Sequence, residues 1–162
     1  MKQQIITTAD GSKTIYLPEW NESYHSQHGA ILEAKHVYIQ AGLDFRFKNH
    51  SDKALNILEI GFGTGLNAFL SCLYATENNL KLNYHSIEKY PLDSKILNEV
   101  KYVDSIDSKS SLFYDLHQSE WEVKTPINKQ FYLKKIKTDL LSFDTNHKYD
   151  VIFFDAFGPR VQ

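Results

Sequence analysis

Four acidic residues, Glu59, Glu88, Asp139 and Asp155, each lie at or near the end of a short apolar stretch of the sequence. Such stretches are typical of buried parallel strands, and open α/β sheets bind ligands beyond the carboxyl ends of their strands. We therefore expect the four carboxylates to converge on one crevice. Because hard cations prefer oxygen ligands, a divalent metal site is one interpretation. An adenosine ligand with a cationic tail is the interpretation that gives each carboxylate a separate partner.

A glycine-rich turn follows the first of these strands. The apolar run from Leu55 to Ile60 leads directly into Gly61, Gly63 and Gly65, and apolar residues at helical spacing come next. Glycine is needed where backbone atoms approach a ligand closely or adopt a positive φ, and the first N–H groups of a helix are free to face that ligand. The segment therefore predicts a strand, a ligand-binding loop and a helix.

The spacing of the glycines argues against a dinucleotide. The third glycine of a dinucleotide-binding fingerprint follows the first by five residues, but Leu66 stands at that position here. Glu59 would also bring a carboxylate close to a pyrophosphate, which suits a ligand with an ammonium group better. Glu88 lies roughly 20 residues beyond the glycines at the tip of the next expected strand, where a carboxylate can accept both hydroxyls of a ribose.

Apolar strands and amphipathic helices alternate through the rest of the chain, which predicts a doubly wound α/β sheet with about four core strands. The expected strands are Leu55 to Ile60, Leu82 to Glu88, Phe131 to Thr138 and Tyr149 to Asp155. Helices are expected from Leu66, from Leu92 to Val100 and around Ser110 to Trp121, with a loop at Pro126 and a short turn or helix before Phe143. Residues 51–162 are assigned to this core.

Residues 1–50 are expected to form an extension packed on the core. Ile5 to Leu17 predicts a β-hairpin outside the main sheet, with its turn at the Asp10-Gly11 pair. A polar and aromatic loop follows, in which Tyr24, His25 and Ser26 are candidate ligand contacts.

A helix is expected after this loop. Its apolar face would carry Ile31, Ala34, Tyr38 and Ala41, and Gly42 is expected to end it, because glycine commonly terminates helices.

The composition is that of a globular protein, with 42% hydrophobic and 14% aromatic residues among 162. A net charge of −2 and a pI near 6.4 give no global attraction to nucleic acid. A local basic face is indicated only at Phe131 to Lys137, where lysines and aromatic residues interleave, although an ordinary strand with solvated lysines has the same pattern. We expect a cytoplasmic protein without membrane contact, because no apolar signal core or membrane span is present in the sequence.

Several classes of site are disfavoured by the sequence. Cys72 is the single cysteine, so neither an intrachain disulfide nor a cysteine metal site is expected, and a small buried apolar role is favoured. The histidines show no HExxH pattern, and no GxSxG elbow or GxxxxGK loop is present. Hydrolase and P-loop functions are therefore poorly supported, and no metal is expected.

In combination, EIGFGTGLN, SIEKYPL and YDVIFFDAFGPR resemble the successive motifs of Rossmann-like class I S-adenosylmethionine-dependent methyltransferases. Together with SYHSQHGAILEAKHVYIQAGL near the N-terminus, they are similar to the tRNA (5-methylaminomethyl-2-thiouridine) methyltransferase family. The resemblance implies that S-adenosylmethionine is the cofactor and that the 5-aminomethyl group of the tRNA wobble uridine is methylated. The family continues beyond DAFGP, so this chain is expected either to lack a C-terminal part or to cover the open edge of its last strand by self-association. Alone, it is expected to bind the cofactor weakly and not to methylate tRNA.

The resemblance also implies roles for individual residues. Asp155 would face the substrate amine as the catalytic residue and border the cofactor. The cofactor would otherwise contact the following residues: Glu59, Gly61, Phe62, Gly63, Thr64, Gly65 and Asn67 in and around the glycine loop, Glu88 at the ribose, Lys89 next to it in the sequence, and Asp139 with Leu140 at the adenine.

Three alternatives stay open. A methyltransferase of the same fold that acts on another amine or on a protein would share the cofactor residues. An NAD-dependent oxidoreductase would use Glu88 in the same way, although Leu66 argues against it. A non-catalytic module that binds the cofactor or a protein partner is the third.

Overall fold

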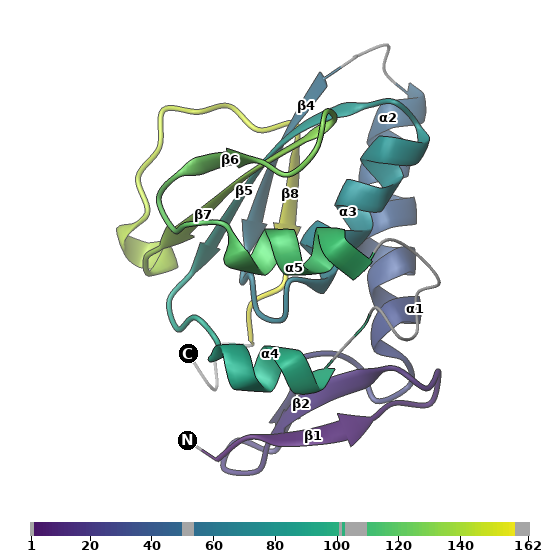
Figure 1. Cartoon of the computed structure of the whole chain (residues 1–162), viewed down its shortest axis with the longest axis vertical. Helices are drawn as coiled ribbons and strands as arrows, with labels where there is room; N and C mark the ends of the chain where they lie inside the picture. The colour runs from purple at the N-terminus through teal and green to yellow at the C-terminus, as the bar shows by residue number, and fades with distance from the viewer. Residues whose placement is uncertain (1, 50–53, 101, 103–109, 158–162) are drawn as a thin grey trace.

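The computed structural model describes residues 2–49, 54–100, 102 and 110–157 of the chain, which form two sheets and a set of helices (Figure 1). The strands are β1 (Gln4–Thr7), β2 (Lys13–Leu17), β3 (Glu22–Ser23), β4 (Ala54–Ile60), β5 (Lys81–Glu88), β6 (Lys124–Pro126), β7 (Phe131–Lys137) and β8 (Val151–Phe154). The helical segments are α1 (Ala30–Ala34), η1 (Lys35–Asp44), α2 (Phe45–Asn49), α3 (Leu66–Glu77), α4 (Ser94–Val100), α5 (Ser110–Gln118) and η3 (Leu140–Ser142). Within these residues, none of the helices combines the length and the apolar composition needed to span a bilayer.

The larger sheet is mixed and mostly parallel, with the strand order β6-β7-β5-β4-β8. The four expected core strands are confirmed as β4, β5, β7 and β8, and they run parallel to one another. β8 pairs with β4, with Val151 opposite Ile57, and forms one edge of the sheet. The carboxyl ends of β4, β5, β7 and β8 consequently meet at one edge of the sheet.

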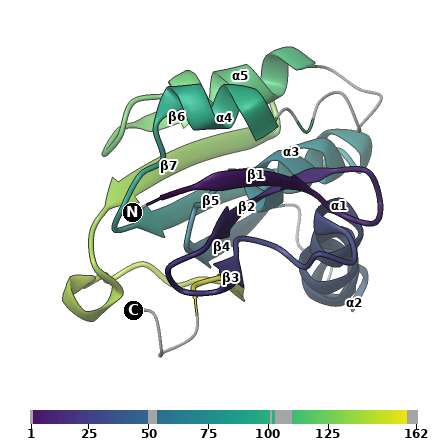
Figure 2. The same ribbon diagram turned by 90° about the horizontal axis from the view of Figure 1, so that it is seen from below.

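The helices of the described residues cover one face of this sheet. In Figure 2, α3, α4 and α5 lie on one side of the strands, whereas η3 lies on the other. The loop after η3 packs on that second face, where Phe143 and Tyr149 contact Leu58, Ile60 and Ile87. Among the described residues, α-helices therefore cover one face of the sheet, and η3 with the loop that follows it covers the other.

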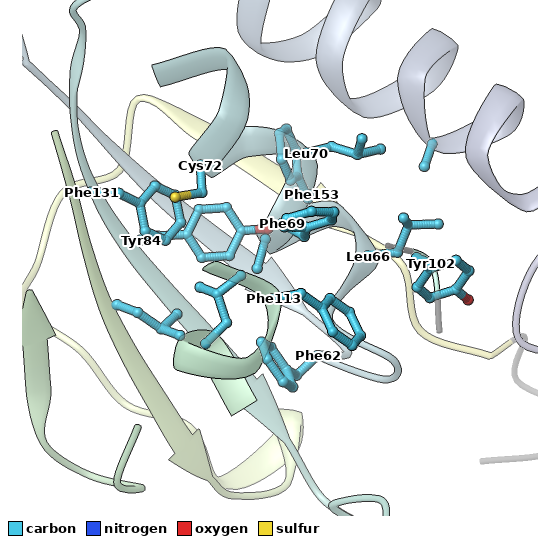
Figure 3. Packing of buried hydrophobic residues seen from close by; sticks show 14 of the residues in the cluster. Phe62, Leu66, Phe69, Leu70, Cys72, Tyr84, Tyr102, Phe113, Phe131 and Phe153 are labelled. Atoms are coloured by element: carbon cyan, nitrogen blue, oxygen red, sulfur yellow. The ribbon is translucent and has the colours of Figure 1, made fainter. Parts of the chain in front are cut away.

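The main core lies between the sheet and these helices. Side chains alternate along each strand, so Leu55 and Ile57 of β4 face the helices while Leu58 faces the other side. Figure 3 shows how the aromatic rings fill this layer. The ring centroids of Tyr84 and Phe131 are 5.3 Å apart, and Phe69 packs edge-on against a ring of α5.

The N-terminal hairpin is confirmed, and it belongs to a separate antiparallel sheet in the order β1-β2-β3. Gly11 has φ 80° in the turn, and Asp10 accepts hydrogen bonds there from the hydroxyls of Thr8 (2.7 Å) and Ser12 (2.6 Å). The other carboxylate oxygen of Asp10 accepts from the backbone N–H of Leu32 at 3.1 Å. This residue thereby joins the hairpin to the helix that follows.

The prediction that this helix ends at Gly42 is wrong. Helical structure runs without a break from α1 through η1, whose hydrogen bonding is π-helical, into α2. A Cβ on Gly42 would lie 3.1 Å from the ring of the buried Phe153, so the glycine allows the helix to approach β8 closely. The buried face also differs from the predicted one, since Leu43 is fully buried and Ala41, expected on the apolar face, is exposed. The wider turn of the π-helix accounts for this shift.

The sequence did not indicate the short strands β3 and β6. The loop predicted at Pro126 is instead the end of β6, where Pro126 pairs antiparallel with Tyr132 at the sheet edge. Proline is compatible with an edge strand because the N–H that it lacks would not be needed for the ladder. The helices expected before Val100 and around Ser110 are confirmed as α4 and α5, and η3 is the short turn expected before Phe143.

In the described structure β8 is an edge strand, and it exposes apolar side chains on the face of the sheet opposite α3 and α5. Ile152 and Phe154 are each 59% exposed. Self-association through this edge stays a prediction.

The contact between Gly42 and Phe153 gives a test of the continuous helix. Gly42→Val is expected to lower the unfolding free energy by about 1–3 kcal/mol, because the added side chain would overpack the interface with β8. Ala41→Val is the matched control, since it adds a β-branched side chain at the adjacent exposed position. Urea denaturation measures both variants, and an equal effect of the two would show that the close approach at Gly42 is unimportant.

Candidate functional site

The glycine loop lies at the carboxyl end of β4 and leads into α3. Gly61, Gly63 and Gly65 have φ values of 94°, 50° and 74°, which L side chains rarely adopt. The N–H groups of Gly61 and Phe62 both donate to the carbonyl of Ile87, at 2.9 and 3.3 Å. A Cβ on Gly61 would lie 2.8 Å from the carbonyl oxygen of Asp155. The loop is thus held between the ends of β5 and β8.

The side chains around the loop are mostly buried, although the sequence suggested that they line the ligand. Glu59, Phe62, Thr64 and Asn67 are 0%, 5%, 1% and 2% exposed. Phe62 packs edge-on against His117, and Thr64 accepts a hydrogen bond from the hydroxyl of Tyr102 at 3.1 Å. The loop therefore offers a ligand its backbone, and these side chains support that backbone from below.

Glu88 lies beside the glycine loop, as expected for a carboxylate at the tip of the second strand. Its Oε2 accepts from the N–H of Gly63 at 3.0 Å, and its Oε1 accepts from the N–H of Tyr90 at 2.8 Å. Each carboxylate oxygen has two acceptor positions, so further hydrogen bonds to a ligand are possible at both. The proposed role of Glu88 in holding a ribose stays a prediction.

Lys89 and Asp139 join the ends of β5 and β7. The Nζ of Lys89 is 2.6 Å from Oδ2 of Asp139, and this contact holds the pKa of the Asp139 carboxyl below its ordinary value. The Oδ1 of Asp139 accepts from the N–H of Leu141 at 2.9 Å, which caps η3. Leu140, in the first position of η3, is 36% exposed and can contact a ligand at this end of the sheet.

Asp155 follows β8 and receives two short hydrogen bonds. The hydroxyl of Tyr38 donates to Oδ1 at 2.7 Å, and the amide of Asn67 donates to Oδ2 at 2.6 Å. Burial raises the pKa of the Asp155 carboxyl to about 6, although both hydrogen bonds act in the opposite direction. The carboxylate is therefore held in place by η1 and α3 and is ionised near neutral pH.

Glu59 is a second carboxyl under the N-terminus of α3. It is fully buried, and its Oε2 accepts from the hydroxyl of Ser86 at 2.6 Å. Burial raises its pKa well above the ordinary value, and the negative charge of Asp155 acts in the same direction. Because its side chain is enclosed, Glu59 does not offer an accessible carboxylate to a ligand ammonium group in this structure.

The polar loop before α1 contributes an aromatic cap to the glycine loop. A Cβ on Gly63 would lie 3.2 Å from the ring of Tyr24, and the ring centroid of Tyr24 is 4.9 Å from that of Phe157. Trp20 packs on the other side of Phe157, at 5.9 Å. Burial raises the pKa of Tyr24, and nearby Glu88 raises it further, so the phenol stays protonated.

The two residues after Tyr24 have other roles. His25 is buried, with Nδ1 3.1 Å from the Thr14 hydroxyl and 3.2 Å from that of Tyr102, and burial lowers its pKa to about 4. Ser26 accepts from the N–H of His28 at 3.1 Å and lies in a local turn. Of the three candidates, the structure places Tyr24 against the glycine loop, whereas His25 supports the loop through Tyr102 and Thr64.

Several residues of this region were not identified from the sequence as part of a site. Tyr38 was assigned only to an apolar helix face, and Trp20, Tyr102 and Phe157 were not singled out at all. Their positions depend on contacts between segments more than 50 residues apart, such as Tyr38 with Asp155, which no local pattern encodes. A search of the described residues finds no group of three or more His, Cys, Asp or Glu side chains that could hold a metal ion.

Comparison with known proteins identifies what the chain is similar to. No protein-family model matches it. A crystal structure of MnmC2 from Aquifex aeolicus superimposes with a TM-score of 0.73 and 28% identity, over 98% of this chain and 50% of that one. The tRNA 5-methylaminomethyl-2-thiouridine biosynthesis bifunctional protein MnmC of Leptospira borgpetersenii is 29% identical over 152 residues, or 86% of this chain.

The chain is a homologue of MnmC. The MnmC protein of Aeromonas salmonicida is 36% identical over 92 residues, which are 46% of this chain. The aligned region is 23% of the Leptospira protein and 14% of the Aeromonas protein, so the chain spans a small part of its curated relatives. The MnmC homology and the mixed sheet with its N-terminal antiparallel sheet agree with the resemblance inferred from the glycine loop and the two later motifs.

The raised pKa of Asp155 gives a prediction for the stability of this MnmC homologue. The pKa is about 6 in the folded protein against an ordinary 3.8, so the folded state binds more protons between these pH values. The unfolding free energy should therefore fall as the pH rises through this range. Asp155→Asn removes the buried charge and is expected to be more stable than the wild type at pH 7, by up to about 3 kcal/mol, with no difference near pH 4.

Urea denaturation at pH 4, 5.5 and 7 measures this effect. Asp115→Asn, at an exposed position of α5, is the control and should show no such pH dependence. A stability difference for Asp155→Asn that stays constant across the three pH values would contradict the assigned cause.

Proposed function

We propose that this chain forms the cofactor-binding part of an S-adenosylmethionine-dependent methyltransferase that acts on the 5-aminomethyl group of the wobble uridine in tRNA. The observation that carries the proposal is the placement of Glu88 and Asp155 on either side of the glycine loop. Glu88 accepts a hydrogen bond from Gly63, and the backbone of Asp155 lies against Gly61. The MnmC relatives support the choice of a tRNA substrate.

The residues at the strand ends fit the parts of this cofactor. The carboxylate of Glu88 retains acceptor positions for two ribose hydroxyls. Asp139 and Leu140 follow the neighbouring strand β7 and are assigned to the adenine, and Lys89, next to Glu88, is paired with Asp139. The first turn of α3 would receive the methionine carboxylate, because the N–H groups at the start of a helix have no intrahelical partner and attract negative charge. A dinucleotide is less suitable, since Leu66 is buried in the core where the third glycine would be needed.

Glu59 would act on the methionine part indirectly. Its side chain is enclosed, and Asn67 lies between it and Asp155, with an amide that already donates to Asp155. We assign Glu59 and Asn67 to positioning of Asp155 and of the loop backbone. Gly61, Phe62, Gly63, Thr64 and Gly65 would contribute their backbone atoms.

Asp155 is the proposed catalytic residue. The bound cofactor would supply an electrophilic methyl group, and the substrate nitrogen needs a free lone pair to attack it. An ammonium group has none, so the site must attract the protonated amine and favour loss of its proton. The Asp155 carboxylate, fixed by Tyr38 and Asn67, can accept hydrogen bonds from this amine and orient it. Protonation of Asp155 below about pH 6 would remove this ability, so methylation is expected to decline there.

The aromatic cap suits the proposed substrate as well. Tyr24, Trp20 and Phe157 are partly exposed next to the glycine loop, and aromatic rings can stack on an unpaired base. We propose that Tyr24 covers the cofactor and that Phe157 faces the base.

Cofactor binding is the first test. Glu88→Ala is expected to weaken S-adenosylmethionine binding by roughly 10- to 150-fold, because a charge-assisted hydrogen bond to a ribose contributes about 1.5–3 kcal/mol. Calorimetry with S-adenosylmethionine and with NAD measures the affinity and separates the two cofactor classes. Glu77→Ala, at an exposed position of α3, is the control. An unchanged affinity in a folded Glu88→Ala protein would exclude the ribose role.

Methyl transfer tests the role of Asp155. In a full-length protein, Asp155→Ala is expected to lower kcat by about 100-fold or more while S-adenosylmethionine affinity changes much less, because the lost interaction acts mainly in the transition state. The assay follows transfer of a labelled methyl group to tRNA that carries 5-aminomethyluridine, with Asp115→Ala as the control. A free amine or a protein tested in the same assay distinguishes the alternative substrates. Normal turnover by Asp155→Ala would exclude the proposed role.

A further inference from the structure

A cavity of about 580 Å³ lies on the face of the large sheet opposite α3 and α5. It is bounded by β5 and β7 on one side and by the loop from Phe143 to Tyr149 on the other. This loop is the yellow segment between η3 and β8 in Figure 1. A smaller cavity of about 280 Å³ continues from it and shares His85, His147 and Tyr149. Because strand side chains alternate, these residues face away from Glu59 and the core below the glycine loop.

A row of basic side chains runs from the floor of this cavity to the neighbouring edge strand β6. Lys134 of β7 is directly opposite His85 of β5 on one side and Lys124 of β6 on the other. Like charges directly opposite one another on a sheet are destabilising. Asp144 is the single acidic residue of the cavity wall. The row therefore has an excess of positive charge that the neighbouring side chains do not balance.

The contacts of these basic groups leave capacity for a ligand. Lys124 donates to the side-chain oxygen of Asn83 at 2.8 Å, whereas no hydrogen bond or ion pair of the Lys134 ammonium is found within the described residues. The Nδ1 of His85 is 2.9 Å from the Tyr149 hydroxyl, and the His85 and His147 ring centroids are 5.2 Å apart. Lys134, His85 and His147 thus converge on one space from a strand, its neighbour and the overlying loop.

The electrostatic state of His85 agrees with an unbalanced positive site. Burial lowers its pKa to about 4, and the positive charges of His147, Lys134 and Lys124 act in the same direction. An anion bound between these groups would raise the pKa of His85, because it would favour the protonated imidazole. The geometry and the charge of this cavity therefore both favour an anionic ligand.

We propose that this cavity binds the phosphate group of a nucleotide or of an RNA strand through Lys134, His85 and His147. A phosphate offers several strong acceptor oxygens, which match one ammonium and two imidazole donors. The volume lies within the range of about 300–1,000 Å³ typical of small-ligand pockets, so a mononucleotide unit can enter. Tyr149 supplies an aromatic surface beside the phosphate for a sugar or a base. Lys134, His85 and His147 are not among the residues proposed to contact the cofactor, so this proposal does not depend on that assignment.

Titration with inorganic phosphate, with uridine monophosphate and with an RNA anticodon stem-loop tests the proposal. Histidine imidazole resonances in NMR spectra report binding, and the signals of His85 and His147 are expected to shift. Lys134→Ala should weaken binding by about tenfold or more, because a charge-assisted contact to phosphate is lost. Lys137→Ala is the matched control, since Lys137 lies on the same strand but is exposed on the other face. The affinity of Lys137→Ala for the phosphate probes should differ from that of the wild type by less than about twofold.

The outcomes separate the two sources of the phosphate. Saturable binding of the mononucleotide but not of the stem-loop identifies a small nucleotide ligand, and the reverse result identifies an RNA contact. Lys134→Gln keeps much of the side-chain length and should lose affinity as Lys134→Ala does, while its circular dichroism spectrum confirms folding. The proposal is wrong if none of the three probes shifts the two histidines, or if Lys137→Ala and Lys134→Ala lose affinity equally. Glu88→Ala should bind the phosphate probes as tightly as the wild type, because Glu88 does not line this cavity. A failure of the cofactor assignment would therefore not affect the phosphate-binding result.

Discussion

The close approach of Gly61 to the backbone of Asp155 is the constraint on which the candidate site depends. A side chain at position 61 would collide with the Asp155 carbonyl, which belongs to backbone and cannot rotate away. The N–H of Asp155 also donates to the carbonyl of Ile60 at 2.9 Å, so the end of β8 is fixed against the end of β4. A residue almost 100 positions further along the chain is thereby brought beside the first turn of α3, where Asn67 can hold its carboxylate.

Holding Asp155 in this position opposes folding. Two carboxyl groups, Glu59 and Asp155, lie under the start of α3, and burial raises the pKa of both. When Glu59 is protonated, Asp155 is the ionised member of the pair. Two negative charges are then not held close together in the interior. The hydrogen bonds from Tyr38 and Asn67 offset part of the desolvation of that charge. Raised pKa values of this kind are common where a group must change its proton affinity during a reaction.

Local patterns in the sequence were enough to predict most of the elements. Strands such as Leu55 to Ile60 are dense apolar runs, and the stripe that begins at Leu66 has helical spacing, so each element carries its own signal. The helix through Gly42 could not be predicted in this way. A glycine in a helical pattern usually indicates an end, and the reason that it does not here is the ring of Phe153, which is more than 100 residues away.

The candidate site was predictable to a smaller extent. Positions at strand ends could be located, because parallel strands place their carboxyl ends together, and Glu88 lies beside Gly63 for this reason. Burial of single side chains could not be predicted. Glu59 and Phe62 are next to the glycines in sequence, yet both side chains pack beneath the loop, since α3 and α5 cover that face of the sheet.

The two adjacent lysines of β7 show why a basic stretch cannot be assigned to a surface from its composition. Lys135 is 1% exposed, its ammonium donates to the carbonyl of His117 at 2.9 Å, and it lies over the ring of Trp121, so burial lowers its pKa to about 8. Lys134 faces the opposite side of the sheet and enters the cavity with His85. The alternation of the strand therefore divides the charge between a buried support for the glycine loop and an open site for an anion. The interpretation of this stretch as solvated lysines is therefore wrong for Lys135, whereas a nucleic-acid contact through Lys134 stays a prediction.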